Sequence, residues 1–461
     1  MGNRRSWCLA LGLGIGLAAL APQDLPATPV DPQILRKIGP RVNAPGRNRN
    51  SLVEIGRRLF FQETFDGNGR TCGTCHPATN NFTIDAAFIR KLPRRDPLFV
   101  AEFNPKLKGL ENSKLLRSAG LILENLDGFD RPGVLRGVPH NLALPTNMKS
   151  DLPGKVHALG WGGDGSPGEG SLRLFAVGAV VQHLPKSLNR EEGVDFRIPT
   201  DEELDALEAF MMSLGRQSEI DLAAMSFSEE IVETGKLRFN GEGINRGCSG
   251  CHNNAGANNG DGINANFDTG TRMLVPNGAP PDGGFGEVQQ DGIAGYGNGE
   301  MNTPSLIEAA DTPPFFHNNS AKTLEDAIRF YGSDTFAASP SGERGRLELT
   351  EDDVRAIGAL LRTLSAMENM RYGNVLAEQA RRTLPRPTAN ERIKEAVAET
   401  NDAIEVLTRG PVKLYAAAVK NLKEAAKLEQ QALGTGGRVQ RNALLGRAIR
   451  LKQDTGALML N

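Results

Sequence analysis

Two short stretches constrain this chain of 461 residues more than any others: Cys-Gly-Thr-Cys-His at 72–76 and Cys-Ser-Gly-Cys-His at 248–252. Each is a Cys-x-x-Cys-His pattern, the attachment signature of a c-type haem. Two thiols about one helical turn apart can each bond one vinyl group of the porphyrin, and the histidine that follows can supply the proximal nitrogen to the iron. A covalently held haem also acts as hydrophobic core, so each pattern predicts a domain folded around a haem.

The expected haem ligands are two thiols and one imidazole in each stretch: Cys72, Cys75, His76, Cys248, Cys251 and His252. A disulfide redox pair would explain the cysteines but not the histidine that follows both pairs. A zinc site would need a fourth ligand at short spacing, and none is visible near either stretch. The sequence therefore favours two covalently bound c-type haems.

The composition agrees with a haem protein made of helices and loops. Aromatic residues make up 5% of the chain, whereas glycine (53) and proline (27) are plentiful, which predicts helices separated by irregular loops. Four of the five cysteines belong to the haem patterns, and Cys8 is the fifth. The formal net charge of −2 gives no indication of a nucleic-acid partner.

The N-terminus has the pattern of a secretory signal peptide over residues 1–21. Arg4 and Arg5 precede an apolar run at 9–20, and Ala-Leu-Ala at 19–21 is a small-x-small cleavage site. The run is short for a membrane span, and an uncleaved anchor is the alternative. Because c-type haem is attached outside the bacterial cytoplasm, the signal and the haem patterns together predict a periplasmic protein.

The predicted fold is mainly α, with two cytochrome c-like haem domains packed together and a C-terminal helical appendage. The two haem patterns lie 176 residues apart, and each follows a helical segment and a glycine-containing turn, which indicates an internal duplication. The expected parts are a signal peptide at 1–21, a linker at 22–50, haem domains at 51–215 and 216–371, and a helical extension at 372–461. Truncation near Arg371 is expected to leave both haems intact. The extension is interpreted as either an interaction module or a homodimer contact.

Local patterns place further helices in both halves of the chain. An apolar run at 172–184 predicts a buried helix, and Thr200 begins a capping box before an amphipathic helix at 204–214. Thr323 and Thr350 occupy capping positions before two more helices in the second half.

A pair of motifs in the second half carries a resemblance to a known family. Residues 312–317 read Thr-Pro-Pro-Phe-Phe-His, and residues 323–331 read Thr-Leu-Glu-Asp-Ala-Ile-Arg-Phe-Tyr. They resemble the Tyr-Pro-Tyr-Phe-His-Asp-Gly stretch and the Thr-Leu-Glu-Glu-Ala-Val helix of the bacterial di-haem cytochrome c peroxidase and MauG superfamily, over roughly residues 51–371. The resemblance implies that Tyr331 is the distal ligand of the second haem. Met301 is the alternative ligand, and a Tyr331 that only packs at a helix end is the plainer interpretation.

The resemblance also implies which haem reacts. In the family the first haem meets the peroxide, and many members close its open face with a histidine in the following loop. No histidine occurs between Pro77 and Pro139, and His140 is the first after the motif. This departure predicts a first haem whose sixth position is open at rest, as in MauG-type enzymes.

Three residues are candidates for catalysis beside that haem. Trp161 matches the family's tryptophan between the two haems, where an indole offers a route for electrons; filling a domain interface is the alternative. The family's distal glutamate has no counterpart in the stretch 178–184, where Gln182 and His183 are the polar residues. A distal His183 could take the proton from bound peroxide and return it to the departing oxygen, although a histidine in an apolar run is often a core residue.

The resemblance finally implies a calcium ion between the domains. The family holds it through backbone carbonyls that match Thr312 and Pro314, together with a residue near Gly137, and carbonyl oxygens suit calcium.

The expected function is a periplasmic peroxidase. Hydrogen peroxide reacts at the first haem, and electrons arrive through the second haem from a small periplasmic donor such as a cytochrome c or a cupredoxin. A MauG-like oxidase of a protein or organic substrate is one alternative, and a di-haem electron-transfer cytochrome is another.

Overall fold

The computed structural model describes residues 49–126, 128–147, 172–284, 297–343 and 345–461. Within these ranges the protein is mainly helical, as the sequence predicts, with two short antiparallel sheets of two strands each. No helix in these ranges is long and apolar enough to cross a membrane. The predicted signal peptide, most of the predicted linker, and Trp161 lie outside the described residues.

The first unit surrounds the stretch 72–76 with short elements and two longer helices. Its helices are α2 (Arg49–Gln62), α3 (Cys72–Cys75), α4 (Ala86–Ile89), α5 (Val100–Phe103), α6 (Ser113–Ala119), α7 (Leu144–Asn147), α8 (Leu172–His183) and α9 (Asp201–Met211). Its 3-10 turns include η1 (Ala78–Asn80), η2 (Pro97–Phe99) and η3 (Pro105–Leu107). Strands β1 (Leu121–Glu124) and β2 (Val134–Gly137) pair in register from Leu121 with Gly137 to Glu124 with Val134. The predicted capping box is present before α9, because Thr200 Oγ1 accepts a hydrogen bond from Glu203 N at 3.3 Å.

The second unit surrounds the stretch 248–252. It contains α10 (Glu230–Phe239), η5 (Cys248–Gly250), η6 (Asn253–Ala255), β3 (Asn266–Phe267), β4 (Met301–Asn302), η9 (Ala309–Asp311), α11 (Leu324–Phe330) and α12 (Asp334–Ala337). Three further 3-10 turns are η7 (Thr271–Met273), η8 (Pro276–Gly278) and η10 (Pro340–Gly342). Strand β3 pairs with β4, Asn266 opposite Asn302 and Phe267 opposite Met301. Thr323 caps α11 through its side chain, as the sequence predicts.

The two units repeat one helix crossing. In the first unit, α2 crosses α9 so closely that a Cβ on Gly56 would lie 1.9 Å from the Ala206 carbonyl oxygen. In the second unit, α10 crosses α13 (Glu351–Arg382) in the same way, and a Cβ on Gly235 would lie 2.0 Å from the Ala356 carbonyl oxygen. A side chain at either glycine would separate the helices. The internal duplication inferred from the motifs is therefore visible in the packing.

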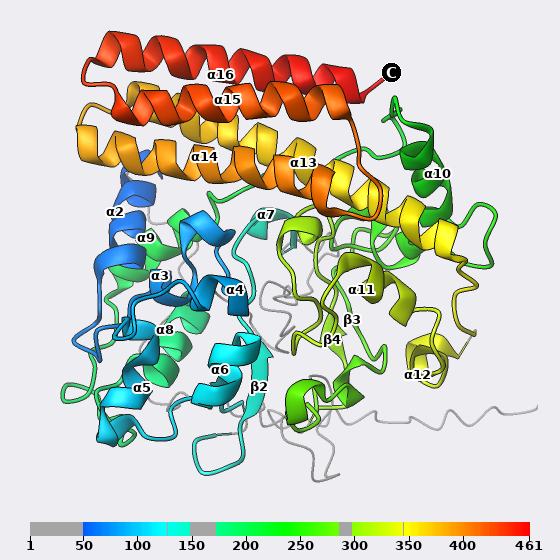
Figure 1. Ribbon diagram of the computed structural model, residues 1–461. Coiled ribbons are helices and arrows are strands. Elements are labelled where there is room, and N and C mark those ends of the chain that lie inside the picture. Colours follow the sequence, from blue (N-terminus) through cyan, green and yellow to red (C-terminus); the bar gives the residue numbers. More distant parts are fainter. Residues whose placement is uncertain (1–48, 127, 148–171, 285–296, 344) are drawn as a thin grey trace, which may run out of the picture.

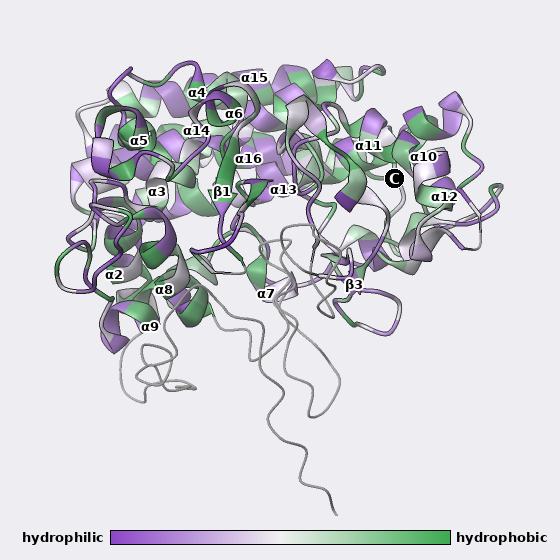
Figure 2. Cartoon of the chain, turned by 90° about the horizontal axis from the view of Figure 1, so that it is seen from below, coloured by the Kyte–Doolittle hydropathy of each residue, from purple (hydrophilic) through white to green (hydrophobic). Residues whose placement is uncertain are grey.

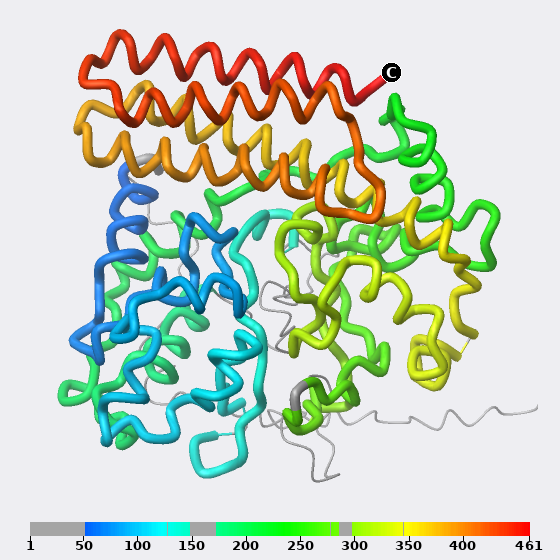
Figure 3. Tube along the Cα trace, viewed as in Figure 1, coloured from blue at the N-terminus to red at the C-terminus, as the bar shows by residue number. Residues whose placement is uncertain are grey.

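The C-terminal helices form a layer that lies across both units (Figures 1 and 3). The layer consists of α14 (Arg386–Arg409), α15 (Ala416–Gly434) and α16 (Arg438–Met459), and α13 leads into it. Near the first unit, Tyr372 and Ile393 share one hydrophobic core with Phe60 and Phe210. A second core includes α13, α14 and α15 together with α10 and α11 of the second unit. Polar contacts follow the same pattern, since Arg57 Nη2 donates to Glu395 Oε1 at 2.5 Å.

This packing does not agree with a dispensable appendage. The expected boundary at residue 371 falls inside α13, which runs without interruption to Arg382. The last residue, Asn461, donates its backbone N–H to the Ser226 carbonyl oxygen at 2.9 Å, at the start of the second unit. Helical periodicity in the sequence predicts which face of a helix is apolar but not which other element covers that face, so the sequence could not reveal these partners.

Candidate functional site

The first motif forms one short helix with its histidine at the end. Thr71 N donates to Thr74 Oγ1 at 2.9 Å before α3, and His76 N donates to the Cys72 carbonyl oxygen at 3.0 Å. His76 Nδ1 lies 2.7 Å from the Phe82 carbonyl oxygen. A carbonyl accepts only from a protonated nitrogen, so this contact assigns the proton to Nδ1 and leaves Nε2 without a proton. Burial lowers the pKa of His76 to about 4, which keeps the ring neutral.

The second motif has the same arrangement. His252 N donates to the Cys248 carbonyl oxygen at 3.0 Å, and His252 Nδ1 lies 3.2 Å from the Gly256 carbonyl oxygen and 3.1 Å from that of Pro304. Burial lowers the pKa of His252 to about 4. The two histidines share one unusual backbone conformation, with φ −120° and ψ 61° at His76, and φ −119° and ψ 61° at His252. Both motifs therefore offer two thiols and one neutral imidazole in the same geometry.

A cavity of about 710 Å³ lies against the second motif. Cys248, Cys251 and His252 line it, and so do Met301 and Tyr331. The volume falls within the range of roughly 300–1,000 Å³ that small-molecule and cofactor sites occupy. The donor set and the volume together fit a haem.

Tyr331 is positioned beside the thiols of the second motif. It is the C-cap residue of α11, and its ring packs against Phe330 and Phe336 with centroids 5.5 and 5.2 Å away. Burial raises the pKa of its phenol, and the neighbouring Cys248 and Cys251 raise it further. The structure brings both predicted distal ligands, Tyr331 and Met301, to one cavity.

The cavity at the first motif is much smaller, about 80 Å³. Cys72, Cys75 and His76 line it, and so do Phe175 and His183 of α8. The donor set there suits a haem, whose ring needs more volume than this cavity provides.

His183 is accompanied by a charged pair that the sequence did not indicate. Its Nδ1 lies 3.8 Å from Glu111 Oε1, and the same oxygen accepts a hydrogen bond from Arg70 Nη1 at 2.8 Å. The side chains of Arg70 and Glu111 are each 1% exposed. Burial alone would raise the pKa of Glu111, but the charge of Arg70, together with His183 and the hydrogen bond from Leu123 N, outweighs burial and lowers it. The carboxylate therefore stays ionised next to His183.

The other predicted catalytic residue of α8, Gln182, is engaged elsewhere. Its Nε2 donates to the Leu123 carbonyl oxygen at 3.3 Å and to Asn125 Oδ1 at 3.1 Å. Gln182 thereby ties α8 to β1, which is green in Figure 2, and it does not line the cavity at the first motif.

The two cavities share one wall. Glu124, Val138 and Pro139 line both of them, so the segment after β2 separates the motifs. The adjacent His140 is half-buried, burial lowers its pKa, and its Nδ1 accepts a hydrogen bond from Leu142 N at 3.3 Å. His140 therefore belongs to the junction between the units.

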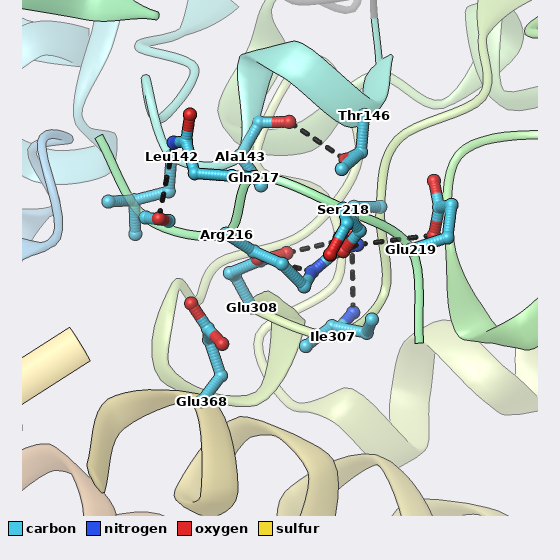
Figure 4. Close-up of polar contacts among 12 residues, drawn as sticks. Leu142, Ala143, Thr146, Arg216, Gln217, Ser218, Glu219, Ile307, Glu308 and Glu368 are labelled. Carbon is cyan, nitrogen blue, oxygen red and sulfur yellow. Dashed lines mark hydrogen bonds and ion pairs between the residues drawn. The ribbon is translucent and has the colours of Figure 1, made fainter. Parts of the chain in front are cut away.

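The junction is held by a buried arginine (Figure 4). Arg216, in the connection between the units, donates from Nη2 to Ser305 Oγ at 3.0 Å and from Nη1 to Glu219 Oε2 at 3.1 Å. Its Nε lies 3.5 Å from Glu308 Oε1, and Ser305 Oγ donates to Glu308 Oε2 at 2.7 Å. Because Ser305 and Glu308 follow the second motif, the network fixes the connection between the units to the second unit.

The residues expected to hold calcium lie at the same junction. Thr312 and Pro314 line the larger cavity, and Gly137 N donates to the His317 carbonyl oxygen at 2.7 Å, which brings β2 beside this segment. In the described part of the chain, no group of three or more His, Cys, Asp or Glu side chains could hold a metal ion. Calcium there would depend on backbone oxygens.

No model of a known protein family matches this chain, and no curated protein matches it. Its function must therefore be inferred from the two motifs and the residues around them. Arg70 and Glu111 are the additions that the structure makes to the predicted set. Arg70 stands two residues before Cys72, but only the folded chain brings Glu111 to it.

Proposed function

We propose that this protein is a periplasmic di-haem c-type peroxidase, in which each unit is a cytochrome c-like haem domain and hydrogen peroxide is reduced at the first haem. The observation that carries the proposal is the matched pair of histidines, His76 and His252, each with Nδ1 on a backbone carbonyl, which leaves Nε2 without a proton. When bound, each haem supplies an iron that changes oxidation state. The chain's own residues supply attachment, orientation and proton transfer.

The hydrogen bonds of the two histidines support the role of proximal ligand. A carbonyl on Nδ1 fixes the tautomer and the orientation of the ring, and it raises the basicity of Nε2 toward a metal. Cys72 and Cys248 are half-buried, and burial raises the pKa of each thiol to about 12. Thiols with such a pKa are protonated at neutral pH, whereas a reactive redox cysteine pair has a thiol with a lowered pKa.

His183, which lines the cavity at the first motif, is the proposed acid-base residue. Glu111 lies within ion-pair distance of Nδ1 and favours a proton on that nitrogen. His183 Nε2 is then free to accept a proton from hydrogen peroxide and to return it to the departing oxygen. The arrangement resembles the carboxylate–histidine pairs that orient a general base in other enzymes.

Tyr331 supports a second candidate function. It lies beside the second motif, and a tyrosinate ligand stabilises the oxidised iron more than a thioether does. A chain with Tyr331 as ligand is suited to keep oxidising equivalents and to oxidise a protein or organic substrate, as MauG-type enzymes do. For the peroxidase, the proposed electron donor is a small periplasmic cytochrome c or cupredoxin.

The test is a haem count on the exported protein, followed by spectroscopy. A pyridine haemochrome assay is expected to give two covalent haems per chain, and His76→Ala or His252→Ala each to disturb one haem. A count of one would contradict the proposal. Electron paramagnetic resonance of the resting protein is expected to give one high-spin and one low-spin ferric signal; two low-spin signals would favour a simple electron carrier. Oxidation of a reduced cytochrome c by peroxide separates the peroxidase from the oxidase.

A further inference from the structure

A basic segment covers the first motif. Residues 90–108 include six basic side chains and only two acidic ones, a net charge of +4 in a chain whose net charge is −2. The basic residues are Arg90, Lys91, Arg94, Arg95, Lys106 and Lys108, and all six are exposed. We call this stretch the basic segment.

The acidic residues of the basic segment are already engaged within the fold. Asp96 Oδ1 accepts a hydrogen bond from Leu98 N at 3.0 Å, and Glu102 forms an ion pair with Arg117 at 2.7 Å. None of the six basic side chains has an ion-pair partner among the described residues. The surface is therefore positive and its charges are free to pair with another molecule.

An exposed aromatic ring lies in the same surface. Phe103 is 43% exposed at the end of α5, and the Arg95 guanidinium carbon is 6.0 Å from its ring centroid. Arginine and aromatic side chains are enriched at protein–protein interfaces, where an aromatic ring serves as an anchor.

The inner side of the basic segment is fixed to the first motif. Ile89, Leu98 and Phe99 form a buried cluster against which Cys75 packs. Arg70 donates from Nη2 to the Leu98 carbonyl oxygen at 2.6 Å and from Nε to the Pro97 carbonyl oxygen at 3.3 Å. The basic segment thus packs on Cys75 through its buried side chains, while its basic side chains are exposed.

We propose that the basic segment is a docking surface for an acidic redox protein that approaches the first motif directly. The proposal rests on the proposed function, because it requires a haem at Cys72 and Cys75. A protein is favoured over an anionic membrane because the charges lie on short helices and turns around one aromatic anchor, rather than along one continuous amphipathic helix. The surface differs from the second motif, through which donor electrons are expected to arrive.

The test uses one probe protein in two charge states: cytochrome c with its native lysines, and the same protein after succinylation has made it acidic. Binding to the haem-loaded chain is measured by calorimetry at low and at high salt. The acidic form is expected to bind and to lose affinity as salt rises, because charge pairing is screened, whereas the native form is expected not to bind.

Two triple variants with the same change in net charge identify the surface. Arg94→Glu/Arg95→Glu/Lys106→Glu is expected to weaken binding of the acidic probe at least tenfold. Lys413→Glu/Lys420→Glu/Lys423→Glu, at three exposed positions in and before α15, is expected to change it less than twofold. Circular dichroism and the haem count of both variants establish that they fold.

Four results would overturn the proposal. The basic-segment variant could bind the acidic probe as tightly as the unchanged chain does. Both variants could also lose the same affinity, which would mean that binding depends on net charge and not on this surface. Phosphatidylglycerol vesicles could instead require the basic segment while the acidic probe does not bind, which would make the surface a membrane contact. A haem count of one would contradict the proposed function, whereas normal haem loading without probe binding would contradict only the docking surface.

Discussion

Replacement of Arg70 by methionine is expected to destabilise the first unit strongly. Methionine keeps much of the side-chain volume but removes the charge that Glu111 faces at 2.8 Å in a site where both side chains are 1% exposed. Removal of one partner of such a buried pair typically costs about 3–5 kcal/mol, because the other charge is left without compensation. The carbonyl oxygens of Pro97 and Leu98 also lose their donor, at about 1 kcal/mol each.

The cost should depend on pH in a defined direction. In the unchanged protein Arg70 lowers the pKa of Glu111, so the pair stabilises the fold above the unfolded pKa of about 4.3, and this contribution is lost as pH falls through the folded pKa. In Arg70→Met, burial instead raises the pKa of Glu111, and the destabilisation grows as pH rises above about 4.3. The difference between the two proteins is therefore expected to be largest near neutral pH and to shrink in acid.

Chemical denaturation followed by far-ultraviolet circular dichroism, at pH 7 and near pH 4, measures both effects. Arg117→Met is the matched control, because its partner Glu102 is at the surface, and its expected cost is below about 1 kcal/mol. The double variant Arg70→Met/Glu111→Gln should recover at least about 2 kcal/mol by removing the orphaned charge. A loss in Arg70→Met below about 1 kcal/mol, or a double variant no more stable than the single one, would refute the buried pair.

Three further predictions follow from the contacts of the two sites. Tyr331→Phe is expected to convert the second haem from low spin to high spin in electron paramagnetic resonance; an unchanged low-spin signal would exclude Tyr331 as ligand and make Met301 the next residue to replace. His183→Ala is expected to slow peroxide turnover by about 10²–10⁴-fold with two haems retained, whereas Gln182→Ala, whose amide binds β1, should slow it much less; equal losses would argue against His183 as the acid-base residue. Truncation at Arg371 cuts α13 and uncovers both cores, so the soluble, haem-loaded yield should collapse; two intact haem spectra would show that the C-terminal layer is dispensable.

Local patterns in the sequence were sufficient to predict helices, because helix formation depends on nearby residues. The apolar run at 172–184 became α8, Leu172–His183, and the Thr350 capping position became the start of α13. Capping and helical periodicity act within a few residues, so a single chain displays them directly. The predicted start at 204 for the next helix was late by three residues, because α9 already includes the acidic residues after Thr200.

The candidate site was harder to predict because its parts are distant in sequence. Glu111 reaches Arg70 and His183 only when the chain folds, and no spacing rule connects these three positions. Gln182 was grouped with His183 because the two are neighbours, but adjacent helical residues point in different directions, and Gln182 faces β1. Long-range packing also determines where residues 372–461 lie. Their composition predicted helices but not the surfaces that these helices cover.

The C-terminal layer has a consequence for how the protein is made. Asn461 pairs with Ser226, and Met459 accepts a hydrogen bond from Ser228 N at 3.1 Å, so the last residues close the start of the second unit. A ribosome adds these residues after both units, and domains otherwise tend to fold in the order in which they emerge. Neither unit can bury its whole core before α16 has been synthesised, because Leu445 belongs to the first core and Met459 to the second. Until then the chain carries exposed apolar surface, a substrate for chaperones.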